Sequence, residues 1–241
     1  MARRLYADIG NSRVKLADCS GSAPQIISVW PSDDAPQLPQ DEVELVVVSV
    51  VPAALERLKQ AAQQRASMVP LRCLGAEIPC PLRLDYATPQ SLGMDRVAAA
   101  FAAWQLSPGG ALVLSAGTAL TLDWVDAHGV FRGGLIAPGR SALARGLATA
   151  APLLPLPTEA ASFPARTSAE CVALGLDVAF SGVVSAALQR ARAACGSELP
   201  LWICGGDAAA AARVLSTNQA SGPMRIDEHL VLRGLARCDE P

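Results

Sequence analysis

The chain has 241 residues, of which 51% are hydrophobic, and its formal net charge is −2. This composition is typical of a folded protein with a large core, and it excludes an intrinsically disordered chain. The small net charge and the dispersed arginines exclude a basic surface for nucleic acid. The seven cysteines have no metal-binding spacing, so we expect reduced thiols.

The N-terminal part of the sequence shows no membrane or export signal. Its longest uncharged apolar stretch, residues 45–55, is interrupted by Ser49 and Pro52 and is too short to cross a bilayer. The residues after Arg4 alternate in polarity and include Asp8, which does not fit the apolar region of a signal peptide. We therefore expect no membrane span and a cytoplasmic protein.

Residues 5–16 predict a β-hairpin, because two strand-like runs flank the small polar turn Asp8-Ile9-Gly10-Asn11-Ser12. A glycine in this turn lets backbone N–H groups approach an anion and tolerates positive φ. A polar stretch follows, then a buried strand over 43–51 and a helix over 53–64 that opens after Pro52. These elements predict a phosphate-binding hairpin followed by a βα unit.

A strand over 69–74, a loop over 79–89 and a helix over 92–106 come next. Gly93-Met94-Asp95-Arg96 stands at the start of that helix, where the helix dipole favours an ionised carboxylate. Asp95 could accept a proton from a substrate hydroxyl, and Arg96 could hold an acidic group of the substrate. The alternative is an ordinary N-terminal helix charge beside a solvated arginine.

Residues 113–123 repeat the first hairpin, with Gly117 aligned to Gly10 and Thr118 to Asn11. Each turn taken alone is ordinary turn chemistry. Because the same pattern occurs in both halves, we expect a duplicated domain. The predicted lobes are residues 1–108 and 109–241, with an active-site cleft between them.

The second lobe continues with a strand at 130–131 and a glycine-rich segment, 133–139, for which we expect strand, turn and helix in that order. Four prolines over 152–164 predict a loop. A long helix or helix pair is expected over 168–194, then a strand over 199–204. The Gly205-Gly206 turn follows, and a helix is expected over 208–215.

The sequence contains no P-loop motif and no Gly-x-Gly-x-x-Gly motif. A nucleotide would therefore be held by the two hairpins at its phosphates and by Gly205-Gly206 at its adenosine. Mg²⁺ would be carried by the nucleotide through water and a nearby carboxylate such as Asp8. This arrangement is typical of the acetate and sugar kinase/Hsp70/actin group.

Six motifs in this order resemble the type III pantothenate kinases, a family that includes the Bvg accessory factor proteins. The resemblance covers nearly the whole chain. The motifs are Asp8-Ile9-Gly10-Asn11-Ser12, Gly93-Met94-Asp95-Arg96, residues 117–123, residues 133–139, Thr167 with Gly175, and Gly205-Gly206.

The resemblance implies an α/β fold of two ribonuclease H-like lobes, a homodimer, and ATP-dependent phosphorylation of pantothenate as the first step of coenzyme A synthesis. It implies that Asp95 is the catalytic base and that Asp8 contacts Mg²⁺ through water. The substrate-binding residues that it implies are Gly93, Met94, Arg96 and, from the partner subunit, Thr167. The ATP-binding residues that it implies are Asp8, Gly10, Asn11, Ser12, Arg13, Lys15, Gly117, Thr118, Gly205 and Gly206.

Two positions depart from the family pattern. Ser115 stands where an aspartate usually begins the second hairpin, and Leu92 stands where a tyrosine is common. The resemblance implies that this aspartate helps to bind a monovalent cation, K⁺ or NH₄⁺. Because a hydroxyl binds a cation more weakly than a carboxylate does, we expect a weakened cation site at Ser115.

Two other functions fit parts of this pattern. A non-catalytic nucleotide-binding accessory or regulatory protein could use the same fold, since a fold does not fix a function. An actin-like or Hsp70-like ATPase switch fits the hairpins but needs much larger lobes than 241 residues can build.

Overall fold

The computed structural model describes residues 3–65, 69–155, 157, 159–196, 198–217 and 222–239. Its contacts divide the chain into two compact units. Unit 1 contains Met1–Ala111, Val125–Gly133 and His229–Pro241, and unit 2 contains Leu112–Trp124 and Gly134–Glu228. The boundary between residues 108 and 109 stays a prediction, and the contacts group two later segments with the N-terminal part of the chain.

Unit 1 contains a five-stranded sheet with the order β3-β2-β1-β4-β5. Its strands are β1 (Arg3–Ile9), β2 (Arg13–Asp18), β3 (Gln25–Pro31), β4 (Val43–Ser49) and β5 (Leu71–Cys73). β1 pairs antiparallel with β2 and parallel with β4. The predicted first hairpin and the strand over 43–51 are therefore confirmed, whereas β3 was not predicted.

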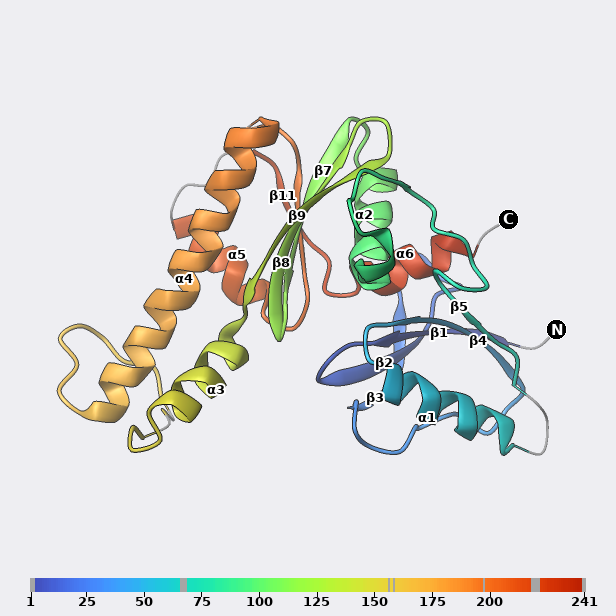
Figure 1. The fold of residues 1–241 in the computed structure, drawn as a ribbon, viewed down its shortest axis with the longest axis horizontal. Helices are drawn as coiled ribbons and strands as arrows, with labels where there is room; N and C mark the ends of the chain where they lie inside the picture. Colours follow the sequence, from blue (N-terminus) through green and yellow to red (C-terminus); the bar gives the residue numbers. More distant parts are fainter. Residues whose placement is uncertain are drawn as a thin grey trace. The chain divides into compact units, whose positions relative to one another are not determined.

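Alternate residues of β1 face two different cores. Leu5, Ala7 and Ile9 pack with α1 (Pro52–Gln63), which has Pro52 in its first turn, as predicted. Tyr6, on the opposite face, packs with residues of α2 (Met94–Leu106) and α6 (Leu230–Cys238). The sheet of unit 1 is thus covered on both faces, by α1 on one and by α2 and α6 on the other (Figure 1).

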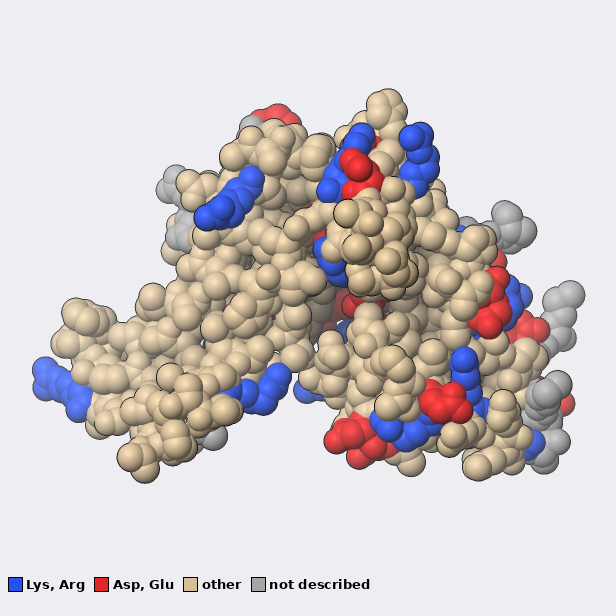
Figure 2. All heavy atoms as spheres, viewed as in Figure 1, with Lys and Arg blue, Asp and Glu red and all other residues tan. Residues whose placement is uncertain are grey.

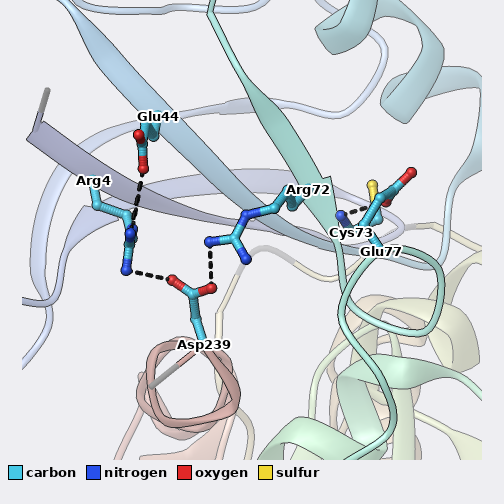
Figure 3. A network of polar contacts seen from close by, with 6 residues as sticks. All are labelled: Arg4, Glu44, Arg72, Cys73, Glu77 and Asp239. Atoms are coloured by element: carbon cyan, nitrogen blue, oxygen red, sulfur yellow. Dashed lines mark hydrogen bonds and ion pairs between the residues drawn. The ribbon is translucent and has the colours of Figure 1, made fainter. Parts of the chain in front are cut away.

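Asp239, just after α6, joins the C-terminal helix to the sheet of unit 1. Its side chain is 1% exposed and forms ion pairs with Arg4 of β1 at 2.9 Å and Arg72 of β5 at 2.5 Å. Figure 3 shows the Asp239 carboxylate between these two guanidinium groups, with Glu44 of β4 on the far side of Arg4. Asp239 is the buried member of this network, whereas the Arg4 and Arg72 side chains are each 44% exposed. The two arginines compensate the buried carboxylate charge and so hold α6 against the sheet.

The second sheet has the order β11-β10-β7-β8-β9-β6. Its strands are β6 (Arg83–Leu84), β7 (Gly110–Ala116), β8 (Ala119–Asp126), β9 (Val130–Pro138), β10 (Leu201–Cys204) and β11 (Met224–Ile226). The hairpin of β7 and β8 confirms the predicted second hairpin. β9 continues through Gly133 and Gly134 as far as Pro138, so the expected turn within 133–139 is limited to Gly139.

The helices of unit 2 are α3 (Arg140–Ala150), α4 (Ser168–Cys195) and α5 (Ala208–Thr217). A core formed by β7, β8 and β10 packs against the buried residues of α4 and α5. α4 is a single helix of 28 residues, which settles the choice between one helix and a pair. Residues 152–164 contain neither helix nor strand where the structure describes them, as predicted for this loop.

Among the described residues, α4 is also long and apolar enough to cross a membrane by length and composition, and 28% of its apolar window is buried. The core helix of a soluble protein passes the same test, so this is weak evidence for a membrane span. In Figure 2 the surface over α3 and α4 is formed mainly by uncharged residues, with isolated basic side chains near its edges.

Candidate active site

The first hairpin of unit 1 turns at Gly10, Asn11 and Ser12. The backbone N–H of Gly10 donates to the Arg13 carbonyl at 3.1 Å, and Asp8 lies opposite Lys15 in the strand register. Asn11, Ser12 and Arg13 are exposed. The turn therefore presents polar side chains and backbone to solvent, as a phosphate-binding loop requires.

The glycines of the two turns do not use the positive φ that a glycine tolerates. Gly10 and Gly117 are not among the described glycines with positive φ. The atom nearest to an added Cβ would be the Arg13 carbonyl oxygen at 3.5 Å for Gly10 and the Ala119 carbonyl oxygen at 3.7 Å for Gly117. Backbone conformation therefore does not demand glycine here, and the open space remains available to a ligand.

Asp95 lies in the first turn of α2, and Gly93 is the N-cap of that helix. The backbone N–H of Arg96 donates to Asp95 Oδ1 at 2.8 Å. Burial raises the pKa of Asp95, while this N–H and the Arg96 guanidinium act in the opposite direction. A side chain at Gly93 would crowd Asp95 Oδ1 and Val50, so the glycine leaves room for the carboxylate.

Asp8, at the end of β1, shares a face of the strand with Tyr6 and therefore faces the side covered by α2. Burial raises the pKa of Asp8 to about 7, the charge of Asp95 adds to the rise, and Lys15 opposes it. The structure thus brings together Asp8 and Asp95, two residues predicted from separate motifs. Carboxylates in such a pair cannot both ionise freely unless a cation joins them.

Arg96 and Met94 are held by packing within unit 1. Arg96 is 9% exposed, and its guanidinium carbon lies 5.7 Å from the centre of the Phe131 ring. Met94 packs against the apolar core under α2 and against Gly75, which has positive φ. The two residues flank Asp95 in the first turn of α2, but their roles toward a substrate stay predictions.

The second hairpin is held by two other predicted segments of unit 2. The backbone N–H of Gly139 donates to the Thr118 carbonyl at 3.1 Å, and a Cβ on Gly139 would overlap the Gly117 carbonyl oxygen. Gly205 has φ of 91° and packs against the backbone of Ala116. The structure therefore brings the Gly117-Thr118 turn and the Gly205-Gly206 turn together, as a shared nucleotide site requires.

Thr167 is the N-cap of α4. Its hydroxyl accepts a hydrogen bond from the backbone N–H of Glu170 at 3.3 Å, and the Glu170 carboxylate accepts one from the Thr167 N–H at 3.0 Å. This capping box gives Thr167 a structural role in starting the helix. A second role toward substrate in a partner subunit stays a prediction.

The carboxylates of Asp8 and Asp95 are hard oxygen ligands of the kind that Mg²⁺ prefers, and a cation would relieve their repulsion. In the part of the chain that the structure describes, there is no group of three or more His, Cys, Asp or Glu side chains that could hold a metal. Asp8 and Asp95 would fit a Mg²⁺ ion that arrives with a nucleotide, because their carboxylates supply oxygen ligands. Ser115, near the end of β7, has a hydroxyl and no charge, and its role toward a monovalent cation stays a prediction.

The sequence did not indicate a role for Ser32 or Arg57. Ser32 hydrogen-bonds to the first turn, and Arg57 hydrogen-bonds to Ser32. Ser32 is 6% exposed and is one of few buried polar residues among those described. Its neighbours in the sequence, Pro31 and Asp33, suggest only a turn. A buried role could have been found only from the pairing of β2 with β3.

Solved structures share this fold. A Baf family transcriptional activator from Campylobacter jejuni matches with a TM-score of 0.59 and 21% identity, over 97% of this chain and 96% of that chain. A protein assigned as a 2-dehydro-3-deoxygalactonokinase from Sinorhizobium meliloti matches with a TM-score of 0.50 and 16% identity, over 98% and 95% of the two chains. The chain therefore shares with these two proteins a fold of the α/β class, which here contains two β-sheets.

The sequence comparisons narrow this class. The family model of the type III pantothenate kinases matches residues 4–190. A type III pantothenate kinase of Halorhodospira halophila is 33% identical over 96% of this chain and 96% of its own length, and one of Methylobacillus flagellatus is 30% identical over 98% and 97%. The chain belongs to the type III pantothenate kinase family.

Proposed function

We propose that this chain transfers the γ-phosphoryl group of ATP to the primary hydroxyl of pantothenate, giving 4′-phosphopantothenate in the first step of coenzyme A synthesis. One structural observation supports the proposal in addition to family membership. The charge of Asp95, a partly buried carboxylate at the N-terminus of α2, raises the pKa of Asp8, and Asp8 stands two residues before the polar turn of Gly10, Asn11 and Ser12.

In the proposed reaction the hydroxyl oxygen of pantothenate attacks the γ-phosphorus, and the bond from that phosphorus to the bridging oxygen breaks, releasing ADP. The hydroxyl proton passes to an Asp95 carboxylate oxygen. When bound, Mg²⁺ neutralises phosphate charge. Because the transition state is loose, most of the rate comes from positioning, and Asp95 acts late.

The nucleotide is held by residues from both hairpins in this proposal. Asp8, Asn11, Ser12, Arg13 and Lys15 serve from unit 1. Gly117 and Thr118 serve at the phosphates and Gly205 and Gly206 at the adenosine, all from unit 2. Pantothenate is held by Gly93, Met94, Arg96 and the Thr167 hydroxyl of a second subunit.

We further propose that the protein is a cytoplasmic homodimer joined through α4. Six small or apolar residues of α4 are exposed and recur at helical spacing, and we call them the α4 face: Cys171, Gly175, Val178, Ala179, Gly182 and Ala186. An open pocket of about 500 Å³ beside them is lined mainly by apolar side chains of α3 and α4, including Leu143 and Leu147. An exposed apolar patch of this kind is typical of a surface that binds a partner.

Small residues of the α4 face also suit a second copy. Among the described residues, nothing lies within 4 Å of a Cβ added at Gly175 or Gly182, so the backbones of two such helices could approach closely.

A non-catalytic accessory role is the second candidate, and Ser115 is the observation that favours it. The solved Campylobacter jejuni relative is named a transcriptional activator. The deciding experiment incubates the purified protein with ATP, Mg²⁺ and pantothenate, with and without K⁺, and detects 4′-phosphopantothenate by mass. Product supports the kinase; ATP binding without product under either condition supports the accessory role.

A further inference from the structure

Ser32, the residue after β3, makes two hydrogen bonds to the first turn. Its hydroxyl donates to the Gly10 carbonyl at 2.5 Å, and its backbone N–H donates to the Ser12 carbonyl at 3.2 Å. The serine is 6% exposed, so solvent competes little for either bond. Two carbonyl groups of the turn therefore point toward one buried residue.

The orientation of these carbonyls fixes the N–H groups of the same peptide units. In a planar trans peptide the C=O and N–H bonds point in opposite directions. The Gly10 carbonyl therefore aims the Asn11 N–H away from Ser32, and the Ser12 carbonyl does the same for the Arg13 N–H. Both N–H groups therefore point away from Ser32, and N–H groups of a turn that are held in this way can bind an anion.

Arg57 of α1 supports Ser32 in turn. Its Nη2 atom donates to the Ser32 carbonyl oxygen, and its Nε atom is buried without a hydrogen-bond partner among the described residues. The Arg57 guanidinium therefore holds Ser32, and the Ser32 hydroxyl in turn holds the Gly10 carbonyl. Arg57 also adds a positive charge on the side of the turn where Ser32 lies. Arg57 thus acts on the turn in two ways, by holding Ser32 in place and by its positive charge.

We propose that Ser32 and Arg57 are positioning residues, which hold the turn of Gly10, Asn11 and Ser12 with its N–H groups directed at the phosphates of ATP. This inference rests on the proposed function only in taking the turn to be a phosphate site. Neither residue touches the reacting atoms; each acts through the turn.

The test is calorimetric binding of ATP and, separately, of adenosine, both without pantothenate. Ser32→Ala is expected to raise the Kd for ATP about 3- to 10-fold, the effect of one lost hydrogen bond. The Kd for adenosine stays unchanged, because adenosine has no phosphate. Ser32→Thr, which keeps the hydroxyl, restores the affinity for ATP. Ser28→Ala is the matched control, since Ser28 of β3 donates to the Gln37 carbonyl at 3.1 Å instead.

Equal ATP affinity in wild type and Ser32→Ala, or an equal loss for ATP and adenosine, overturns the inference. If Ser32→Ala fails to fold, the binding of ATP and of adenosine is compared in Arg57→Met and Arg57→Lys instead. Lys59→Met, on the same helix, is then the control. A wild-type protein that binds ATP but forms no product contradicts the proposed function alone. A wild-type protein that does not bind ATP overturns the phosphate-binding role of the turn.

Discussion

Asp8 at the end of β1 and Asp95 at the start of α2 form a pair of carboxylates in which the charge of Asp95 raises the pKa of Asp8. The pair arises because Asp8 lies on the face of β1 that α2 and α6 cover. Burial of two acids costs stability unless a cation or a proton neutralises one of them. Such a cost is typical of a functional site.

Removing the Asp8 carboxylate should recover this cost in stability. The pKa of Asp8 is about 7 in the folded state, above its ordinary value of 3.8. The folded state therefore binds more protons than the unfolded state between these values, and the free energy of unfolding falls as pH rises through that window. Asp8→Asn is expected to raise the free energy of unfolding near about pH 8 by on the order of 1 to 4 kcal/mol.

Urea denaturation of both proteins measures this difference. The gain from Asp8→Asn should shrink steadily as the pH falls from about 7 to about 3, below the ordinary pKa of 3.8, where the wild-type carboxyl is mostly protonated in both states. Asp34→Asn, an exposed acid after β3, is the control and should change stability little at any pH. A constant difference between wild type and Asp8→Asn across this range would contradict the raised pKa.

Gly139→Ala tests the support of the second hairpin. The added Cβ overlaps the Gly117 carbonyl oxygen, so the turn must shift. We expect a loss of about 1 to 3 kcal/mol in stability and a raised KM for ATP. Gly146→Ala in α3 meets nothing within 4 Å and should instead stabilise the protein by about 0.5 to 1 kcal/mol. Similar behaviour of the two variants would show that the close approach at Gly139 is unimportant.

Val178→Glu tests the α4 face. Val178 is 63% exposed, so the folded subunit should tolerate a charge there, whereas an apolar interface should not. The wild-type protein is expected to sediment as a dimer and the variant as a monomer. Val29→Glu, on the exposed side of β3, is the matched control and should stay dimeric. If the wild-type protein sediments as a monomer, or if it sediments together with lipid vesicles, the α4 face does not bind a second copy of the chain.

Ser115→Asp tests the weakened cation site. A carboxylate binds a monovalent cation better than a hydroxyl does, so the variant should need less K⁺ for its half-maximal rate. The measurement is the initial rate against K⁺ concentration at saturating ATP and pantothenate. Superimposable K⁺ curves for the two proteins would mean that Ser115 does not take part in cation binding.

Local chemistry explains what the sequence could predict. Both hairpins and the helix that starts near Asp95 depend on short patterns of strand residues, turn residues and caps, and all are present. The proximity of Asp8 to Asp95 depends instead on which face of β1 α2 covers. No pattern within either motif contains that information.

The two wrong or incomplete expectations have similar causes. β9 passes through Gly133 and Gly134 because sheet pairing and the close approach of Gly134 to the backbone at Leu122 outweigh the turn preference of a glycine pair. Ser32 and Arg57 could not be predicted as supporting residues, because their role depends on β3 lying beside β2. Tertiary contacts therefore decide the parts of the site that spacing alone cannot reveal.

The most direct test of the account is 4′-phosphopantothenate formation by wild type, Asp95→Asn and Asp34→Asn, with ATP binding measured on each protein. We expect wild type and Asp34→Asn to form product at equal rates. Asp95→Asn should lose about 10²- to 10⁴-fold in kcat while it keeps its fold and its affinity for ATP. Full turnover by Asp95→Asn, or none by a wild-type protein that binds ATP, would contradict the account.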